Sequence, residues 1–453
     1  MTHRTRLLLC RWGFVLLCVL PTAIVSTWIV VRPFLVSSPA QKAEWERELT
    51  SRLGLVVQIN NVSYPRAGFA ELAGCRLLDP ETRAGVAGID QVNILRDGRG
   101  WQVAASQLSI EGSQLKLLAR AIDERLLRGP LVEGSGGHGR IQFTASDVLV
   151  QRSVCQQTLQ QMGGELNLAA SGAQMTIQIR LAGAAVDSQP IRLTCKRQLS
   201  KENPATQWEL DTTGVPVPCS LAAELAPELA GLGADCQFAG VVQIAHSPDE
   251  LRGQLSGTLT GVDLDSLITE QFPHQLSGTA TFKIEQGLIE HGKLVDLRGT
   301  MQATGGAISL SLISAAAEHL GLSASATSSD ENPGKAIPFR QLAIGFRLNG
   351  QALSVTGNAD PMQSGALLAN ASGPILSAPP QHSVAAVGLL RTLLPDSEHQ
   401  VPATRQTAAL VRLFPVPDLA PTTSARLPAH TPTRLAPAAA EPVRSAVRPP
   451  VLR

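Results

Sequence analysis

The chain has 453 residues, of which 44% are hydrophobic, and this allows packed cores in about two to four domains. Lys and Arg number 38 against 37 Asp and Glu, so the net charge of +1 favours neither nucleic acid nor an acidic substrate. Aromatic residues make up only 4%, which speaks against base-stacking platforms and carbohydrate sites. We therefore expect aliphatic cores and no nucleic-acid partner.

An uncharged run of twenty residues, 12–31, follows an arginine-rich start. At about 1.5 Å of rise per residue, such a helix is long enough to cross a hydrocarbon core of about 30 Å. The basic residues before it place the N-terminus in the cytoplasm and the bulk of the chain outside. A cleavable signal peptide is the alternative, because Ser38 and Ala40 suit a processing site. The run exceeds the length of about 7–15 residues typical of such peptides, so we predict an uncleaved single-pass anchor.

A short amphipathic helix is predicted directly after the anchor. Pro39 suits its first turn, Trp45, Leu49 and Leu53 recur at four-residue spacing, and Gly54 is placed to end it. The helix either lies on the lipid surface or plugs the end of the sheet that follows.

The next region reads as strands interrupted by two helical segments. Turn formers separate short alternating runs, and helical periodicity begins at Ser113 and again over 220–232. The predicted strands are 55–59, 69–78, 86–95, 101–110, 141–150 with one break, 165–169, 175–181, 191–195 and 208–211. A GxGxxG match at 134–139 leads into a strand rather than a helix, so it indicates a turn and not a dinucleotide site.

Strict alternation of apolar and polar residues marks 238–312, which predicts a sheet with one apolar and one polar face. Glycines recur on the apolar face, where they leave room and permit curvature. Candidate lipid-facing residues on this face are Leu251, Leu255, Leu259, Leu276, Phe282 and Ile284. The alternation is expected to continue through Ile308, Leu310 and Leu312.

The remaining elements are a short helix at 314–321, a hairpin around Asn349-Gly350, and an amphipathic helix at 384–394. From Pro395 onward the chain is rich in proline and lacks apolar periodicity. A disordered or extended tail is expected there.

No reaction centre emerges from the sequence. The nine histidines do not cluster, no serine lies in a plausible GxSxG elbow, and Asp263 and Asp265 suit a turn. The cysteines are widely spaced without CxxC, so one or two disulfides are allowed in an oxidising compartment, with the pairing open. We expect no catalytic residue, metal or cofactor.

Several short motifs resemble AsmA-like proteins. One is the anchor followed by the amphipathic helix and Leu53-Gly54-Leu55-Val56-Val57; others are the segments 77–82, 255–258, 262–264, 276–280, 287–292 and 306–309. The resemblance spans most of residues 1–360, although the chain is short for the family and its tail departs from the pattern. It implies a curved β-groove that is anchored in the inner membrane, with most of the chain in the periplasm. It also implies a role in phospholipid transport or outer-membrane assembly.

The sequence thus predicts a mainly β protein, with a transmembrane helix followed by an elongated, curved antiparallel sheet that forms an open groove with a few short helices. Its partners would be membrane lipids and envelope proteins. The rival interpretation is a closed sandwich core in a scaffold that binds no lipid. The expected regions are 1–36 (tip and anchor), 37–54 (amphipathic helix), 55–236 (first β region), 237–394 (second β region) and 395–453 (tail).

Overall fold

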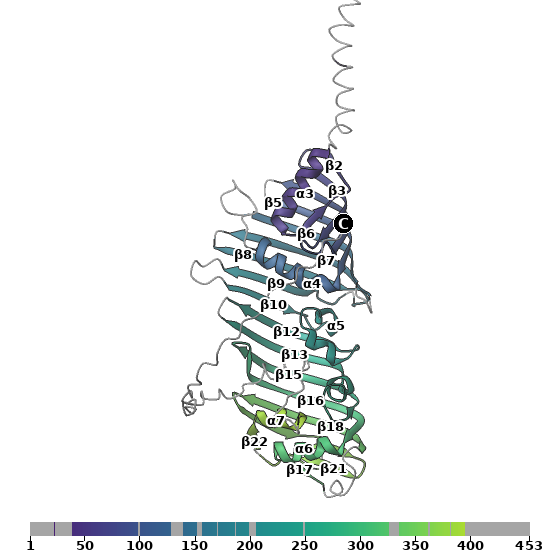
Figure 1. Cartoon of the computed structure of the whole chain (residues 1–453), viewed down its shortest axis with the longest axis vertical. Coiled ribbons are helices and arrows are strands. Elements are labelled where there is room, and N and C mark those ends of the chain that lie inside the picture. The colour runs from purple at the N-terminus through teal and green to yellow at the C-terminus, as the bar shows by residue number, and fades with distance from the viewer. Residues whose placement is uncertain are drawn as a thin grey trace, which may run out of the picture. The chain divides into compact units, whose positions relative to one another are not determined.

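The computed structural model describes a long, open, curved mixed β-sheet with a few short helices (Figure 1). It describes residue 22 and residues 39–97, 100–127, 139–151, 156–169, 171–185, 187–198, 205–247, 250–325, 335–360, 363–380 and 382–394. All of these lie in one compact unit, Met1–Val416; a second unit, Pro417–Arg453, lies outside the described residues.

Strands dominate the described residues. Those of the first half are β1 (Val56–Gln58), β2 (Asn61–Arg66), β3 (Phe69–Leu78), β4 (Gly85–Asp97), β5 (Gly100–Glu111), β6 (Gly139–Gln151), β7 (Gln156–Ala169), β8 (Gly172–Leu181), β9 (Ile191–Gln198) and β10 (Ala205–Asp211). Those of the second half are β11 (Val217–Pro218), β12 (Gln237–His246), β13 (Leu251–Asp263), β14 (Leu276–Ser277), β15 (Thr279–Glu290), β16 (Lys293–Ser309), β17 (Ser323–Ala324), β18 (Ala336–Asn349), β19 (Ala352–Gly357), β20 (Ala366–Asn370), β21 (Gly373–Ser377) and β22 (Ser383–Ala385).

Helical segments lie between the strands. They are α3 (Pro39–Leu53), η2 (Gly112–Gln114), α4 (Leu115–Ala121), η3 (Ile122–Leu126), α5 (Cys219–Ala222), η4 (Pro227–Leu232), η5 (Asp265–Thr269), α6 (Leu310–Leu320) and α7 (Val387–Leu393).

The long strands pair in chain order. Because β10 pairs with β12, the two predicted β regions, 55–236 and 237–394, belong to one sheet. Among the strands that the structure describes, all pairs are antiparallel except β5 with β6, which is parallel. The expectation of a wholly antiparallel sheet is therefore wrong at this one place. A parallel pair needs a crossover connection, and η2, α4 and η3 provide it.

One face of the sheet carries apolar side chains in register from strand to strand, and we call it the inner face. Representative members, one per long strand, are Leu77, Val92, Val103, Phe143, Leu166, Ile177, Leu193, Trp208, Val242, Leu255, Phe282, Met301, Ile344 and Val355. Cross-strand partners share a face, so these pairings make a continuous apolar stripe.

A row of irregular positions crosses the N-terminal strands. Gly74, Gln107 and Asp147 have positive φ values of 64°, 52° and 54° and are passed over in the pairing of β3, β5 and β6, while the register on either side of them is unchanged. The inward-facing positions move by one residue at this row, from Ala145 to Val148 on β6, which explains the break that the sequence shows in that strand.

Phenylalanine rings occupy the space that the inner-face glycines leave. Phe143 pairs with Gly164 and Phe346 with Gly299 across adjacent strands. A Cβ added at Gly164 would come within 2.5 Å of the Phe143 ring, and one at Gly299 within 2.9 Å of the Phe346 ring. The glycines therefore hold aromatic rings flat against the sheet.

The helices cover the inner face near both ends of the sheet. Trp45, Leu49 and Leu53 of α3 pack on a cluster from β1–β5, as the plug interpretation predicts, and Trp45 Nε1 donates a hydrogen bond to Tyr64 Oη at 2.6 Å. The segment α4–η3 covers the next strands, and Leu115 and Ile122 pack on two further clusters. Figure 1 shows both helices in front of the sheet.

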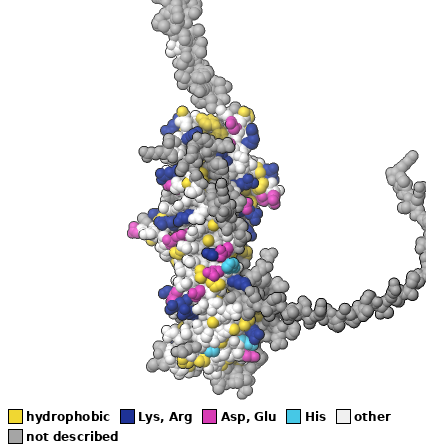
Figure 2. Space-filling model, turned by 90° about the vertical axis from the view of Figure 1, so that its left-hand side faces the viewer, with side chains coloured by type: hydrophobic (Ala, Val, Ile, Leu, Met, Phe, Trp, Pro, Cys, Tyr) yellow, Lys and Arg dark blue, Asp and Glu magenta, His cyan; other side chains and the backbone are white. Residues whose placement is uncertain are grey.

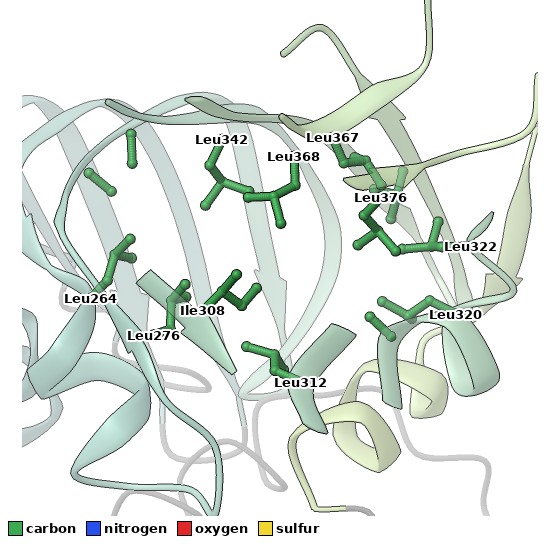
Figure 3. Packing of buried hydrophobic residues seen from close by; sticks show 14 of the residues in the cluster. Leu264, Leu276, Ile308, Leu312, Leu320, Leu322, Leu342, Leu367, Leu368 and Leu376 are labelled. Carbon is green, nitrogen blue, oxygen red and sulfur yellow. The ribbon is translucent and has the colours of Figure 1, made fainter. Parts of the chain in front are cut away.

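The C-terminal end of the sheet surrounds a buried hydrophobic cluster. Leu264, which precedes η5, and leucines from α6 and β14 point toward leucines from β18, β20 and β21, which arch over them (Figure 3). We call this cluster the C-terminal core. Ile313 and Leu368, both 0% exposed, lie within it.

The helix α6 begins earlier than the alternation predicts. Leu310 and Leu312 were expected on a strand, but β16 ends at Ser309, whose Oγ accepts from Leu312 N at 3.4 Å and caps the helix. Gly321, with φ 61°, ends it as expected. The terminal helix is likewise shorter than predicted, because β22 takes its first residues.

The predicted anchor, residues 12–31, and the tail, 395–453, lie outside the described residues, apart from residue 22. Among the helices that the structure describes, none has the length and apolar character needed to span a bilayer. The anchor and the expected regional boundaries remain predictions.

Candidate functional site

The inner face lacks a hydrophobic cluster over part of β12, β13 and β15. Register places the side chains here on one side: Val242 pairs with Leu255, Ile244 with Gly253, and Gly257 with Ile284. We call the five large aliphatic residues of this area the central patch. They are Val242, Ile244, Leu251, Leu255 and Ile284.

The central patch is unusually open to solvent for apolar side chains. Within the described part of the chain, three large hydrophobic residues are exposed: Leu225 at 51%, Ile244 at 42% and Leu251 at 41%. Two of the three belong to the patch, and the other patch residues are half-buried without joining any hydrophobic cluster. A contiguous apolar area of this kind on a water-facing sheet is typical of a binding surface.

An ion pair between the buried Arg197 and the half-buried Asp123 borders the patch toward the N-terminus. Arg197 on β9 is 5% exposed, and its Nη1 donates to Asp123 Oδ1 at 2.8 Å and to Thr206 Oγ1 at 2.7 Å. Thr206 Oγ1 also donates to Asp123 Oδ1 at 2.8 Å. Asp123 belongs to η3, so this network links the helical segment α4–η3 to β9 and β10 beside the patch.

The C-terminal core borders the patch on the other side. Leu259, Phe282 and Ile289 are half-buried and pack against that core. The transition from the patch to the core therefore takes place along β13 and β15. Three strands at about 4.8 Å spacing give the patch a width of roughly 10 Å along the sheet.

Charged side chains lie next to the patch at the start of β13 and on the turn between β15 and β16. Glu250 Oε1 is 2.6 Å from Arg252 Nε and 3.5 Å from His291 Nε2. The hydrogen bond and charge of Glu250 raise the pKa of Arg252, so Arg252 stays cationic. Acidic and basic side chains are also interspersed along the side of the molecule shown in Figure 2.

The predicted lipid-facing residues divide into two groups. Leu251, Leu255 and Ile284 lie in the central patch, while Leu259 and Phe282 pack at the margin of the C-terminal core. The sixth residue, Leu276, is 7% exposed and belongs to that core.

Sequence reasoning missed the contribution of β12 to the patch. Val242 and Ile244 continue the alternation of Phe238 and Gly240, and this signal would have identified them. Their pairing with β13 places them beside Leu255.

Other potential sites are distinct from the patch. Among the described residues, no three His, Cys, Asp or Glu side chains group to hold a metal. Burial raises the pKa of Cys75 to about 11 and of Cys195 to about 12, so neither is a ready nucleophile. A cavity of about 780 Å³ opens beside β18 and the β20–β21 turn, and none of its lining residues belongs to the patch.

No family model, no curated protein and no solved structure matches this chain.

Proposed function

We propose that the chain is a non-enzymatic, membrane-anchored envelope protein whose central patch binds lipid acyl chains. The observation that carries the proposal is the exposure of Ile244 and Leu251 on an otherwise covered apolar face. Covering such side chains contributes about 25 cal/mol per Å² of apolar area removed from water. An acyl chain supplies that cover without needing any polar partner, which matches the purely aliphatic patch.

Three further features support an acyl chain as the occupant. The patch side chains carry no hydrogen-bonding group, so they select for shape and hydrophobicity. The charged residues Glu250 and Arg252 lie at the end of the patch, where a polar headgroup would meet water. The apolar run at 12–31 would hold the patch near a source of lipid.

The resemblance to AsmA-like proteins gives this binding its proposed context, which is phospholipid transport or outer-membrane assembly in a bacterial envelope. In that context the N-terminus is cytoplasmic and most of the chain is periplasmic. The inner face would then shield acyl chains while the polar outer face contacts water.

Lipid quantification on the full-length protein tests the proposal. Phospholipid that copurifies per chain is measured for the wild type, for Leu255→Asp and for the matched control Gln254→Asp. Gln254 is the exposed neighbour of Leu255 on the same strand, and alternation turns it to the outer face. We expect Leu255→Asp alone to lose a defined portion of bound lipid while keeping its circular dichroism spectrum and urea midpoint.

Two outcomes contradict the proposal. Unfolding of Leu255→Asp would mean that this residue belongs to a dry core. A folded variant with unchanged lipid would mean that the patch receives another occupant, such as an apolar segment of a protein partner, as the scaffold interpretation predicts.

A further inference from the structure

Two buried cysteines face each other at the ends of the helical segment α5–η4. Cys219 follows β11, and Cys236 precedes β12. Pro218 pairs with Gln237, so the two cysteines occupy the adjacent rung, where Cys219 N donates to Cys236 O at 2.8 Å. Their Sγ atoms are 2.8 Å apart.

This arrangement satisfies the requirements of a disulfide. Antiparallel partners have Cα atoms about 4.5–5.5 Å apart, inside the window of about 4.4–6.8 Å that a disulfide spans. Moving the sulfur atoms from 2.8 Å to a bonded distance needs only a small rotation of each side chain. The two other cysteines that the structure describes, Cys75 and Cys195, lie in separate clusters and offer no competing partner.

Other roles for the pair fit less well. Cys219 is 4% exposed and Cys236 is 0% exposed, whereas a catalytic thiol needs access to its substrate. Within the described residues, no third His, Cys, Asp or Glu joins the pair to form a metal site.

We infer that Cys219 and Cys236 form a structural disulfide in the exported chain. The inference rests on the proposed export, because cytosolic thiols are kept reduced. The oxidant is a disulfide of a thiol–disulfide exchange catalyst or of oxidised glutathione. Its sulfur–sulfur bond breaks as the Cys219–Cys236 bond forms, and it leaves as two thiols that carry the two protons and two electrons.

The two sulfur atoms share one hydrogen bond, in which either thiol can be the donor. Either cysteine can therefore supply the attacking thiolate, and the other then displaces the oxidant from the mixed disulfide.

The disulfide would fix the ends of the segment α5–η4, which contacts two hydrophobic clusters of the sheet. Leu221 of α5 packs on the cluster beneath α4, and Leu232 of η4 packs on the C-terminal core. Closing this loop restricts the unfolded chain and stabilises the region beside the central patch.

Thiol trapping of the full-length protein tests the inference. Cells that express it in a bacterial envelope are quenched with an alkylating reagent in denaturant, and peptides are mapped by mass spectrometry without reduction. We expect one linked peptide pair containing Cys219 and Cys236, lighter by two hydrogen atoms than the sum of its parts, and alkylated Cys75 and Cys195. In Cys219→Ala, Cys236 should become alkylated. Reduction should lower the melting temperature of the wild type by about 5 °C but leave Cys219→Ala unchanged.

A second arm refolds the purified, reduced protein from urea in the presence of oxidised glutathione, so that the oxidant reaches both thiols before they are buried. Linkage in both arms supports the inference, and linkage in the second arm alone would retain the pairing but overturn the exported location. Alkylation of both cysteines in both arms would overturn the disulfide wherever the protein resides. Copurifying lipid is a separate readout, so failure of the disulfide is distinguishable from failure of acyl-chain binding.

Discussion

The central patch and the C-terminal core both lie on strands in which apolar and polar residues alternate, but the patch is exposed to solvent and the core is buried. Leu255 on β13 and Leu342 on β18 both occupy inward-facing positions of alternating strands. Leu342 is 4% exposed because α6 and neighbouring strands pack over it, whereas no hydrophobic cluster includes Leu255. Alternation therefore identifies an apolar face, and the segments that fold over it decide whether that face becomes a core or a surface.

The largest expected effect is a charge placed in the C-terminal core. Leu368 is fully buried, so Leu368→Asp would desolvate a carboxylate without a partner and create strain. We expect a loss of more than about 4 kcal/mol in the free energy of unfolding, and no folded protein in circular dichroism. A folded Leu368→Asp protein would mean that this end of the sheet is as open as the patch.

Breaking the ion pair at the border of the patch should have the next largest effect. Asp123→Ala leaves the buried Arg197 without its carboxylate, which costs about 3 kcal/mol in urea unfolding. The double variant Asp123→Ala/Arg197→Met removes both charges and should recover much of that loss. No recovery in the double variant would show that the pair does not fasten η3 to the sheet.

A methyl group at an inner-face glycine should destabilise the sheet moderately. In Gly299→Ala, the Cβ would come within 2.3 Å of Lys283 O and 2.9 Å of the Phe346 ring, so we expect a loss of about 1–3 kcal/mol. Gly85→Ala is the matched control, because nothing lies within 4 Å of its added Cβ. Equal urea midpoints for the two variants would contradict the packing of phenylalanine on glycine.

The smallest effect on stability is expected in the patch itself. Ile244 is 42% exposed, so Ile244→Asp should change the free energy of unfolding by less than about 1 kcal/mol. Its expected consequence is reduced lipid copurification with an unchanged urea midpoint. A large loss of stability would place Ile244 in a core, and the contrast with Leu368 would disappear.

Local patterns predicted the regular parts of the fold well. Spacing of Trp45, Leu49 and Leu53 predicted α3, alternation predicted the long strands, and Asn349-Gly350 predicted the β18–β19 hairpin, where Gly350 has φ 56°. These features are determined by residues close together in the sequence, so they can be predicted from a single sequence without an alignment.

The remaining features depend on residues far apart in the chain. The parallel pairing of β5 with β6 follows from how η2, α4 and η3 cross the sheet, and no strand pattern encodes that. Leu251 and Leu276 carry the same alternation signal, yet only Leu276 is covered, because η5, α6 and β16 pack around it. The pattern could therefore list six candidates for a lipid-facing surface but could not separate the patch from the core.

Photo-crosslinking in cells tests the central claim most directly. A photoreactive benzophenone side chain replaces Ile244 in the full-length protein, and in a second variant it replaces the adjacent Gln243, which alternation turns to the opposite face. After illumination, mass spectrometry of the modified peptide identifies what was captured. We expect phospholipid adducts at position 244 and none at 243; an absence of lipid at 244, or equal capture at both positions, would contradict acyl-chain binding by the central patch.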